Sequence, residues 1–294
     1  MDNRILREKE GNSMREYSVL NIDSRQFGGM ETLFPDWDGN NERLLVYSPH
    51  DDDAILGAGY AMRKALDDGA EVHIIIVCNG NCGYSTVEEK DTIVEKRKRE
   101  TLDCYKTFGI PEENILFLGY PDFSALNYIG RSLDDTREGH FRTTITELRK
   151  RKITRILVPN HYHEHVDHIA AYMMGAYDAP QVGDMHSVDW AEPYAVKSVA
   201  QYSVWADLDP EDAVLAGRDP KLRANTLMLV SKDVEQTVIQ GIMKYPSQMA
   251  IIDSLVQARR ARELKDGRFM EVYLRFDPRP KLSFEPYREF VESL

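Results

Sequence analysis

The sequence predicts an α/β fold, a Rossmann-like three-layer sandwich with a mainly parallel sheet and a functional site at the carboxyl ends of the strands. Two observations lead to this prediction. Between residues 44 and 177, short apolar segments alternate with amphipathic segments of helical period, which is the pattern of right-handed strand–helix–strand units. In addition, two clusters of histidine and carboxylate residues, at 48–53 and 163–168, each follow an apolar segment directly.

Each element is supported by its own pattern. Residues 72–78 form a nearly continuous run rich in β-branched side chains, which is typical of a strand buried on both faces. Residues 58–66 carry small and apolar side chains at helical spacing, and Gly69 follows as a plausible C-terminal cap. The expected strands are 44–47, 72–78, 115–118, 156–158, 198–204, 226–230 and 271–276. The expected helices are 58–66, 91–108, 141–151, 168–177 and 234–245.

The pattern divides the chain into residues 1–42, an N-terminal extension, and residues 43–294, a single domain. The extension is polar and contains turn-forming residues such as Gly28-Gly29. Residues 1–17 are crowded with charges and lack the apolar core of a signal peptide. No apolar run approaches the ~20 residues that a membrane-spanning helix needs. We therefore expect a cytoplasmic protein without a membrane span.

Composition narrows the classes of partner. The chain has 294 residues, with 37 lysines and arginines against 49 aspartates and glutamates, and its net charge of −12 argues against sequence-independent binding to nucleic acid or to an anionic membrane. Its cysteines are Cys78, Cys82 and Cys104, an odd number without paired spacing, which indicates a protein with reduced thiols. The sequence leaves open whether the chain forms a homo-oligomer.

Topology predicts that the two polar clusters meet. In an open parallel sheet, the loops that leave the carboxyl ends of the strands lie along one edge and form the ligand crevice there. The cluster at 48–53 leaves the first strand of the expected domain, and the cluster at 163–168 leaves the fourth. Imidazole and carboxylate groups gathered at one edge are the materials of a metal site with an acid–base group beside it.

The spacing favours three particular ligands. A catalytic zinc takes three protein ligands and keeps one position open. His50 and Asp53 are three residues apart at a strand-to-helix bend, so both can turn toward one ion, and His168 can be the third ligand from the other loop. The alternative for the acidic turn is a helix N-cap, because aspartates there satisfy free backbone N–H groups.

The remaining residues of the clusters suit proton transfer. Asp52 is next to Asp53, so we expect its side chain to point in a different direction, and it could take a proton from the attacking water. His165 is three residues before His168, so the start of a helix puts both on one face, and one of them can face the reacting group. Asp167 could orient His165 and favour its protonated form, which would raise its pKa.

At these residues the chain resembles the LmbE-like, or PIG-L, family of zinc-dependent de-N-acetylases. His50-Asp51-Asp52-Asp53 stands where the family has His-Pro-Asp-Asp, and His165-Val166-Asp167-His168 where it has His-Pro-Asp-His. The similarity runs from about residue 44 to 248, with weaker matches at 97–100, 117–122 and 245–248. Asp51 and Val166 replace the two family prolines, so both loops lose a fixed φ.

The resemblance implies a complete set of roles. Zinc would be held by His50, Asp53 and His168, with Asp52 as general base and His165 as the group that stabilises the oxyanion and helps the amine leave. By position, Arg97 and Asp122 would contact the substrate, although an ion pair on a helix surface is the alternative for Arg97. Ala54 replaces the glutamate of the first family motif, which removes one carboxylate near the site.

The sequence therefore predicts a zinc-dependent hydrolase that removes the N-acetyl group from an N-acetylated amino sugar, of N-acetylglucosamine type, or from a related small conjugate. One alternative is a metal-dependent phosphoesterase, because Asp/His clusters also hold paired metals. Another is a sugar-binding protein of the same fold without turnover. His161 and His163, in the loop before the second motif, either shape the substrate pocket or face solvent.

Overall fold

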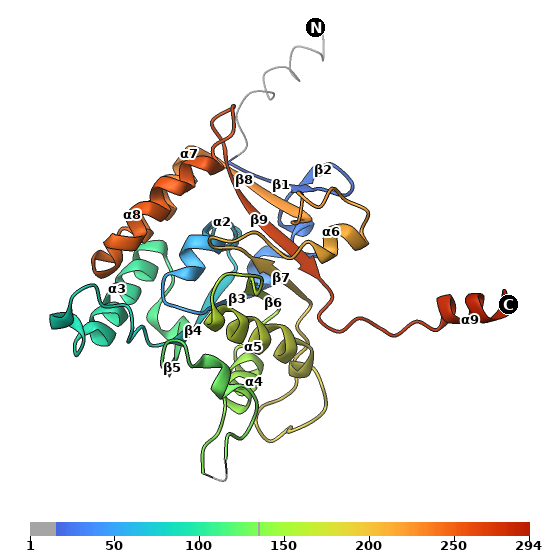
Figure 1. Cartoon of the computed structure of the whole chain (residues 1–294), viewed down its shortest axis with the longest axis horizontal. Coiled ribbons are helices and arrows are strands. Elements are labelled where there is room, and N and C mark those ends of the chain that lie inside the picture. Colours follow the sequence, from blue (N-terminus) through green and yellow to red (C-terminus); the bar gives the residue numbers. More distant parts are fainter. Residues whose placement is uncertain (1–15, 135) are drawn as a thin grey trace, which may run out of the picture.

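The computed structural model describes residues 16–134 and 136–294, and one mixed sheet runs through this part of the chain (Figure 1). The order of its nine strands is β2-β1-β8-β9-β7-β6-β3-β4-β5. The strands are β1 Tyr17–Asn21, β2 Gln26–Gly28, β3 Arg43–Ser48, β4 Glu71–Cys78, β5 Ile115–Tyr120, β6 Arg155–Pro159, β7 Ser198–Tyr202, β8 Thr226–Val230 and β9 Phe269–Phe276. The helices are α2 Asp53–Asp67, α3 Ile93–Phe108, α4 Phe141–Lys150, α5 Val166–Val182, α6 Glu211–Leu215, α7 Lys232–Ile242, α8 Met249–Ala258 and α9 Glu285–Glu292.

The sheet is parallel over only half its width, which corrects the expectation of a mainly parallel sheet. Strands β7, β6, β3, β4 and β5 pair in parallel, as the alternation of strands and helices predicts. The pairs β7–β9, β9–β8, β8–β1 and β1–β2 are antiparallel. In the β8–β9 pair Val230 lies opposite Phe269, so the intervening segment begins and ends at one edge of the sheet and β9 runs back beside β8.

The N-terminal stretch 1–42 is not separate from this sheet. Its first 15 residues lie outside the described part of the chain. Strand β1, however, pairs with β8 along its whole length, from Tyr17 opposite Val230 to Asn21 opposite Thr226. Residue 42 is therefore not a boundary of the sheet, and the division of the chain into an extension and one domain stays a prediction.

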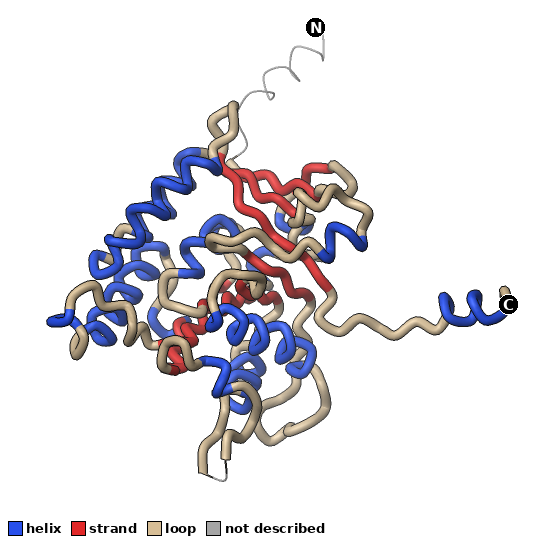
Figure 2. Tube along the Cα trace, in the orientation of Figure 1, coloured by secondary structure: helices blue, strands red, loops and turns tan. Residues whose placement is uncertain are grey.

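Helices cover both faces of the sheet (Figure 2). Alternate side chains of β3 show the two faces: Leu44 and Val46 join the apolar cluster that contains residues of α2, α3 and α7, whereas Leu45 and Tyr47 join the cluster under α4 and α5. This alternation is the period of a strand buried on both sides. Every described helix is too short or too polar to cross a membrane.

Helix α2, which follows the first polar cluster, approaches the sheet closely and is kinked. A Cβ at Gly57 would lie 2.5 Å from the ring of Tyr202 on β7, so this contact requires glycine. Ala58 has non-helical dihedrals, φ −125° and ψ 16°. The carbonyl of Leu56 accepts hydrogen bonds from Arg259 Nη1 at 2.9 Å and from Arg262 Nη2 at 3.1 Å. The two guanidinium groups therefore fix the first turn of α2 from outside the helix.

A buried ion pair joins the beginnings of the two strands that lead to the site. Arg155 of β6 donates to both carboxylate oxygens of Glu42, at 3.1 and 2.8 Å, and Lys197 donates to one of them at 2.8 Å. Burial alone would raise the pKa of Glu42, but the bonds from Arg155 and Lys197 outweigh it and lower this pKa from 4.5 to about 2.

Replacement of this carboxylate should destabilise the fold. We expect Glu42→Gln to lower the free energy of unfolding at pH 7 by about 3 kcal/mol, because it leaves the buried Arg155 without its counter-charge. The unfolded chain takes up a proton on Glu42 below pH 4.5 and the folded chain only near pH 2, so wild type loses this advantage as the pH falls through that window. Urea denaturation of both proteins in steps below pH 7 measures the difference. A difference that did not shrink on acidification would contradict this account.

Candidate metal centre

Two loops at one edge of the sheet build the site. Strands β3 and β6 are parallel neighbours, with Leu44 opposite Arg155 and Val46 opposite Leu157. The loop after β3 leads into α2, and the loop after β6 leads into α5, which begins at Val166. The two polar clusters are therefore brought together as topology predicts.

Both histidines of the predicted triad converge on one carboxylate oxygen. Asp53 Oδ2 lies 3.1 Å from His50 Nδ1 and 3.2 Å from His168 Nε2. The potential ligand atoms of the three residues all lie within 4.8 Å of one another. His168 Nε2 is buried and makes no hydrogen bond to the described residues, so in the neutral ring its lone pair is free to bind an ion. Two nitrogens and one oxygen in this arrangement fit a zinc ion with an open position.

The charge of the site also suits a cation. Burial lowers the pKa of His50, but the carboxylates of Asp167 and Asp53 outweigh it and raise this pKa to about 10. Burial also lowers the pKa of His168, but the carboxylate of Asp53 outweighs it and raises this pKa to about 9. Without another cation, the imidazoles themselves neutralise the carboxylates. A dication in the centre would take over that charge and leave the imidazoles neutral, as ligation requires.

The acidic turn does not act as a helix cap. Asp52, at the N-cap position of α2, makes no side-chain capping bond. The hydroxyl of Ser48 instead accepts from the backbone N–H of Ala54 at 3.0 Å, and Asp53 Oδ2 accepts from the backbone N–H of His50 at 2.8 Å. Ser48 therefore caps this turn, and the carboxylate of Asp52 is not used as a cap.

Glu164, which sequence reasoning missed, holds the third candidate ligand, His168. Its Oε2 lies 2.7 Å from His168 Nδ1. Its Oε1 accepts from the backbone N–H groups of Val204, Trp205 and Ala206 at 2.9–3.1 Å. A carboxylate behind a ligating imidazole fixes the tautomer that presents the other nitrogen to the metal. The available signal was the spacing of four residues between Glu164 and His168.

Asp167 lies beside two histidines: the expected His165, whose Nδ1 is 3.6 Å from its Oδ2, and also His50. Its carboxylate lies 3.4 Å from His50 Nε2 and accepts from the backbone N–H of Phe123 at 2.7 Å and of Ala125 at 3.2 Å. The ring of His165 instead accepts, at Nδ1, from the backbone N–H of Asp167 at 3.1 Å. Asp167 therefore orients the ligand His50.

The pKa of His165 is lowered, which corrects the expected rise. Burial is the largest cause, and the positive charge of His50 adds to it, whereas the attraction of Asp167 is smaller. Because Nδ1 accepts a hydrogen bond, the single ring proton of neutral His165 lies on Nε2. His165 is therefore a neutral hydrogen-bond donor.

Asp52 and His165 line one cleft of about 160 Å³, together with His50 and Asp53. The side chains of Asp52 and His165 are 16% and 20% exposed, so water and a small ligand can reach them. Burial raises the pKa of Asp52 to about 7, an effect that Arg97 opposes and Asp51 reinforces. A carboxylate of this kind beside the triad can accept a proton near neutral pH.

Arg97 and Asp122 also line this cleft, but their charged groups are already bound. Arg97 is 5% exposed and donates to both oxygens of Asp51, with the bond from Nε at 3.0 Å. Asp122 accepts from the backbone N–H groups of Gly80 and Cys82, both at 2.9 Å. Both residues shape the wall of the cleft, and their contact with substrate stays a prediction.

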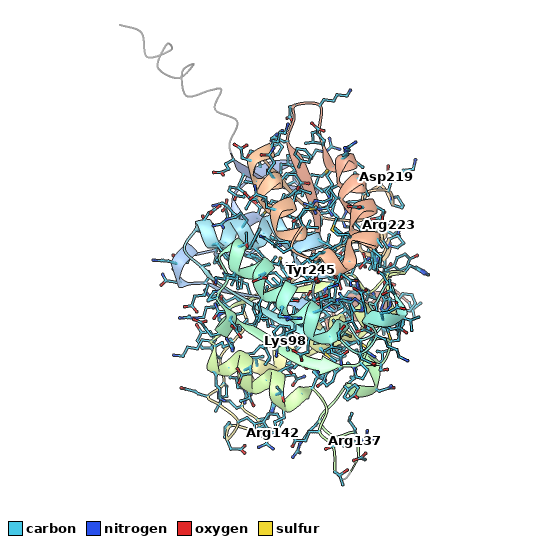
Figure 3. All side chains as sticks on the ribbon, turned by 90° about the vertical axis from the view of Figure 1, so that its left-hand side faces the viewer. Lys98, Arg137, Arg142, Asp219, Arg223 and Tyr245 are labelled. Atoms are coloured by element: carbon cyan, nitrogen blue, oxygen red, sulfur yellow. The ribbon has the colours of Figure 1, made fainter. Side chains whose placement is uncertain are left out.

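The ion pair of Asp51 explains how the first loop keeps its shape without proline. Thr101 also donates to its carboxylate, at 3.1 Å. The backbone carbonyl of Asp51 accepts hydrogen bonds from the hydroxyls of Tyr105 at 3.1 Å and Tyr245 at 2.7 Å; Tyr245 is labelled in Figure 3. Side-chain bonds to α3 and to the segment after α7 thus restrain a backbone that a family proline would restrain through φ.

The mouth of the cleft is apolar and aromatic, which the sequence did not indicate. Phe123 is 64% exposed and packs against His165 with ring centres 4.6 Å apart. Trp205 is 48% exposed and stacks on His168 at 5.6 Å. Ile251 of α8 adds a third exposed side chain, and the free thiol of Cys82 lies among them.

His161 and His163 do not line this cleft. His161 stacks on Tyr172 with ring centres 4.3 Å apart, and its Nδ1 lies 3.3 Å from the side-chain oxygen of Gln201. His163 packs edge-on against Tyr162. His161 therefore serves as a histidine control outside the centre.

Comparison with known proteins agrees with the motifs. The family model described as PIG-L, GlcNAc-PI de-N-acetylase, matches residues 45–177. A diacetylchitobiose deacetylase of Thermococcus kodakarensis is 23% identical over 169 residues, which cover 55% of this chain and 60% of that protein. The match thus spans less than two thirds of the relative. The predicted resemblance is confirmed.

Solved structures show the same fold. The N,N′-diacetylchitobiose deacetylase of Pyrococcus horikoshii has a TM-score of 0.59 and 18% identity, over 83% of this chain and 88% of its own. The 4-carboxy-2-hydroxymuconate hydratase of Pseudomonas putida has a TM-score of 0.56 and 15% identity, over 82% of this chain and 99% of its own. The same fold therefore occurs in proteins named for different reactions.

Metal content tests the triad. We expect one zinc per chain after reconstitution and gel filtration, and strong loss of zinc in His50→Ala and His168→Ala, because each variant leaves two of three ligands. Elemental analysis gives the stoichiometry, and His161→Ala is the matched control that keeps the metal. Full occupancy in either ligand variant would show that the ion binds elsewhere.

The role of Glu164 has its own test. Glu164→Gln should keep the fold but weaken zinc binding by about 10–100-fold, the usual effect of losing a carboxylate behind a ligating histidine. Competition with a chelator measures the affinity, and Glu88→Gln, at an exposed site, controls for the loss of one negative charge. An affinity equal to that of wild type would mean that Glu164 only anchors the loop at 203–206.

Proposed function

We propose that this chain, whose residues 45–177 form a PIG-L (LmbE-like) domain, is a zinc-dependent hydrolase. Its reaction would be removal of the N-acetyl group from an N-acetylglucosamine-type amino sugar or a related small conjugate. The observation that supports this most is the triad of His50, Asp53 and His168, of which His50 and Asp53 line one small cleft together with Asp52 and His165. The deacetylase named among the relatives acts on a chitobiose, which suggests the substrate class.

The residues of the cleft divide the proton transfers between them. When bound by the triad, zinc supplies Lewis acidity, which polarises a carbonyl and makes water more acidic. Asp52 takes the proton of the attacking water, and the new C–O bond turns the acetamide carbonyl into an oxyanion. Neutral His165 donates a hydrogen bond from Nε2 to that oxygen. Asp52 then returns its proton to the nitrogen, the C–N bond breaks, and the amine and acetic acid leave and exchange a proton to become ammonium and acetate.

A phosphoesterase with two metals fits less well. Such a site needs a second set of free ligands about 3.5–4 Å from the first ion. Asp51 is bound by Arg97, and the two further groups of potential ligands in the described residues, Cys78 with Asp122 and His165 with Asp167, are each completed only by His50, which the triad already uses. A sugar-binding protein without turnover remains the non-enzymatic alternative, and release of free amine from any N-acetyl sugar would exclude it.

We also propose that the protein works in the cytoplasm. Its three cysteines are free thiols, of which Cys78 and Cys104 are buried and Cys82 is exposed. An exposed thiol at the mouth of the cleft suits a reducing compartment, where it is not oxidised.

The general base can be tested apart from the metal. Asp52→Asn should keep zinc and fold, because asparagine is nearly isosteric, and should lower kcat by about 10²–10⁴-fold, the usual contribution of a positioned base. Release of free amine from N-acetylglucosamine and diacetylchitobiose gives the rate, and elemental analysis gives the metal. Asp233→Asn, on the exposed side of α7, is the matched control. Normal turnover in Asp52→Asn would assign the proton to another group.

A further inference from the structure

The C-terminal segment of the chain leaves the body of the molecule. After β9 ends at Phe276, residues 277–284 carry the chain outward without regular structure, and α9 follows at a distance from the other elements (Figure 1). All hydrogen bonds and ion pairs of residues 283–294, within the described part of the chain, join residues of that same segment. We call residues 277–294 the arm.

The arm presents an apolar face that its own chain does not cover. Five large side chains are between 65% and 91% exposed: Phe284, Tyr287, Phe290, Val291 and Leu294. Their spacing of three and four residues places them along one side of the helix. A helix this short is marginal in water by itself, so most of its stability must come from packing of that face against a partner.

The root of the arm is held in place. Arg279 donates two hydrogen bonds to the carboxylate of Asp184, at 2.9 and 2.8 Å. Asp184 lies in the loop after α5, so this pair fixes the direction in which the arm leaves the body. Because the pair is exposed, it guides the arm rather than stabilising the fold.

The body carries a groove of matching character. Leu20, Ile22, Leu222 and Leu227 line a depression of about 640 Å³. Its polar edge holds two arginines and two aspartates: Arg25, Arg218, Asp23 and Asp219. Leu222 is 50% exposed. The loop that contributes it carries Asp219 and Arg223, which lie at the periphery of the molecule in Figure 3.

Groove and arm share one edge of the sheet. Ile22 of the groove directly follows Asn21, the last residue of β1. Asn21 pairs with Thr226 of β8, and Thr226 pairs with Tyr273 near the end of β9. The end of β9, Phe276, lies opposite Val199 at the beginning of β7. The zinc site lies at the other end of these strands, so the groove and the arm are remote from the cleft.

We propose that α9 is an exchange arm: in a two-fold dimer, α9 of each copy packs its apolar face into the groove of the other. The charges do not oppose this contact, because Arg25 and Arg218 at the groove edge are balanced by Asp23 and Asp219, and this nearly neutral edge does not repel the acidic residues 285–292, with three glutamates and one arginine. The same acidic charge disfavours an anionic membrane surface, which attracts basic helices.

The area agrees as well. A large aromatic side chain buries about 150–250 Å² when fully covered, so five side chains of this exposure offer roughly 500–700 Å² per arm. Monomers rarely leave an apolar patch of more than about 300–600 Å² uncovered. Two arms and two grooves together reach the roughly 1,200–2,000 Å² that a stable, specific interface buries.

The oligomeric state of the full chain tests the proposal. Wild type should sediment and scatter light as a dimer, twice the 33.8 kDa of one chain. Tyr287→Asp with Phe290→Asp on the arm, and separately Leu222→Asp in the groove, should each shift the protein to monomer at the same concentration. Val87→Asp is the matched control, because Val87 is 77% exposed in a different part of the surface. All variants should keep their zinc content, which shows that each still folds.

The other outcomes overturn the proposal. A monomeric wild type would show that the arm does not dimerise the chain. A dimer that persists in the groove variant, or in the arm variant, would place the interface elsewhere. Monomeric protein that floats with phosphatidylcholine–phosphatidylserine vesicles through α9 would make the arm a membrane anchor.

A cross-link distinguishes exchange from docking of the arm on its own chain. In a Cys82→Ser background, Tyr287→Cys protein mixed with Leu222→Cys protein should give a disulfide-linked dimer on mild oxidation. Tyr287→Cys mixed with Val87→Cys should not. If the first mixture gives no linked dimer while a single chain with both changes forms an internal disulfide, the arm folds back on its own body and the exchange is wrong.

Discussion

Both imidazoles of the candidate centre converge on Oδ2 of Asp53, and much of the surrounding structure keeps them there. Each ring is held between this oxygen and a second carboxylate on its far side, Asp167 for His50 and Glu164 for His168. Backbone amides of the loops at 123–125 and 203–206 bind those outer carboxylates in turn. The geometry of the centre therefore depends on two loops far from it in sequence, and both also contribute aromatic side chains to the cleft.

The first loop shows how a change of sequence can keep a shape. A proline would restrict φ before the acidic pair, whereas Asp51 reaches the same end through its contacts with Arg97, Thr101 and two tyrosine hydroxyls. On the other side, Arg259 and Arg262 hold the carbonyl of Leu56 at the kink of α2. The loop with the candidate ligands is thus held by Arg97 at Asp51 and by the pair Arg259 and Arg262 at Leu56, and neither contact depends on a metal.

The sequence predicted the parts of this molecule that local patterns encode. Strands such as 72–78 and the two polar clusters are contiguous signals, and the parallel half of the sheet follows from their alternation. The strand Tyr17–Asn21 was missed because it pairs with residues more than 200 positions away, and its polar surroundings resemble a loop. Glu164 was missed for a related reason: its position depends on hydrogen bonds from the backbone amides at 204–206, which sequence spacing does not reveal. The pKa of His165 depends on burial and on the charge of His50, which are properties of the assembled cleft.

The lowered pKa of His165 fits the proposed hydrolysis better than a raised pKa would. A protonated His165 would place another cation beside His50 and beside the metal, and burial opposes such a charge. A neutral ring whose Nδ1 accepts from the backbone of Asp167 still offers a proton at Nε2, which is what an oxyanion needs. The carboxylate of Asp167 is then free to support His50, and in the proposed reaction the proton that moves is carried by Asp52. The two histidines of the second motif therefore differ in role because different atoms of the same chain occupy their Nδ1: a backbone N–H for His165 and the carboxylate of Glu164 for His168.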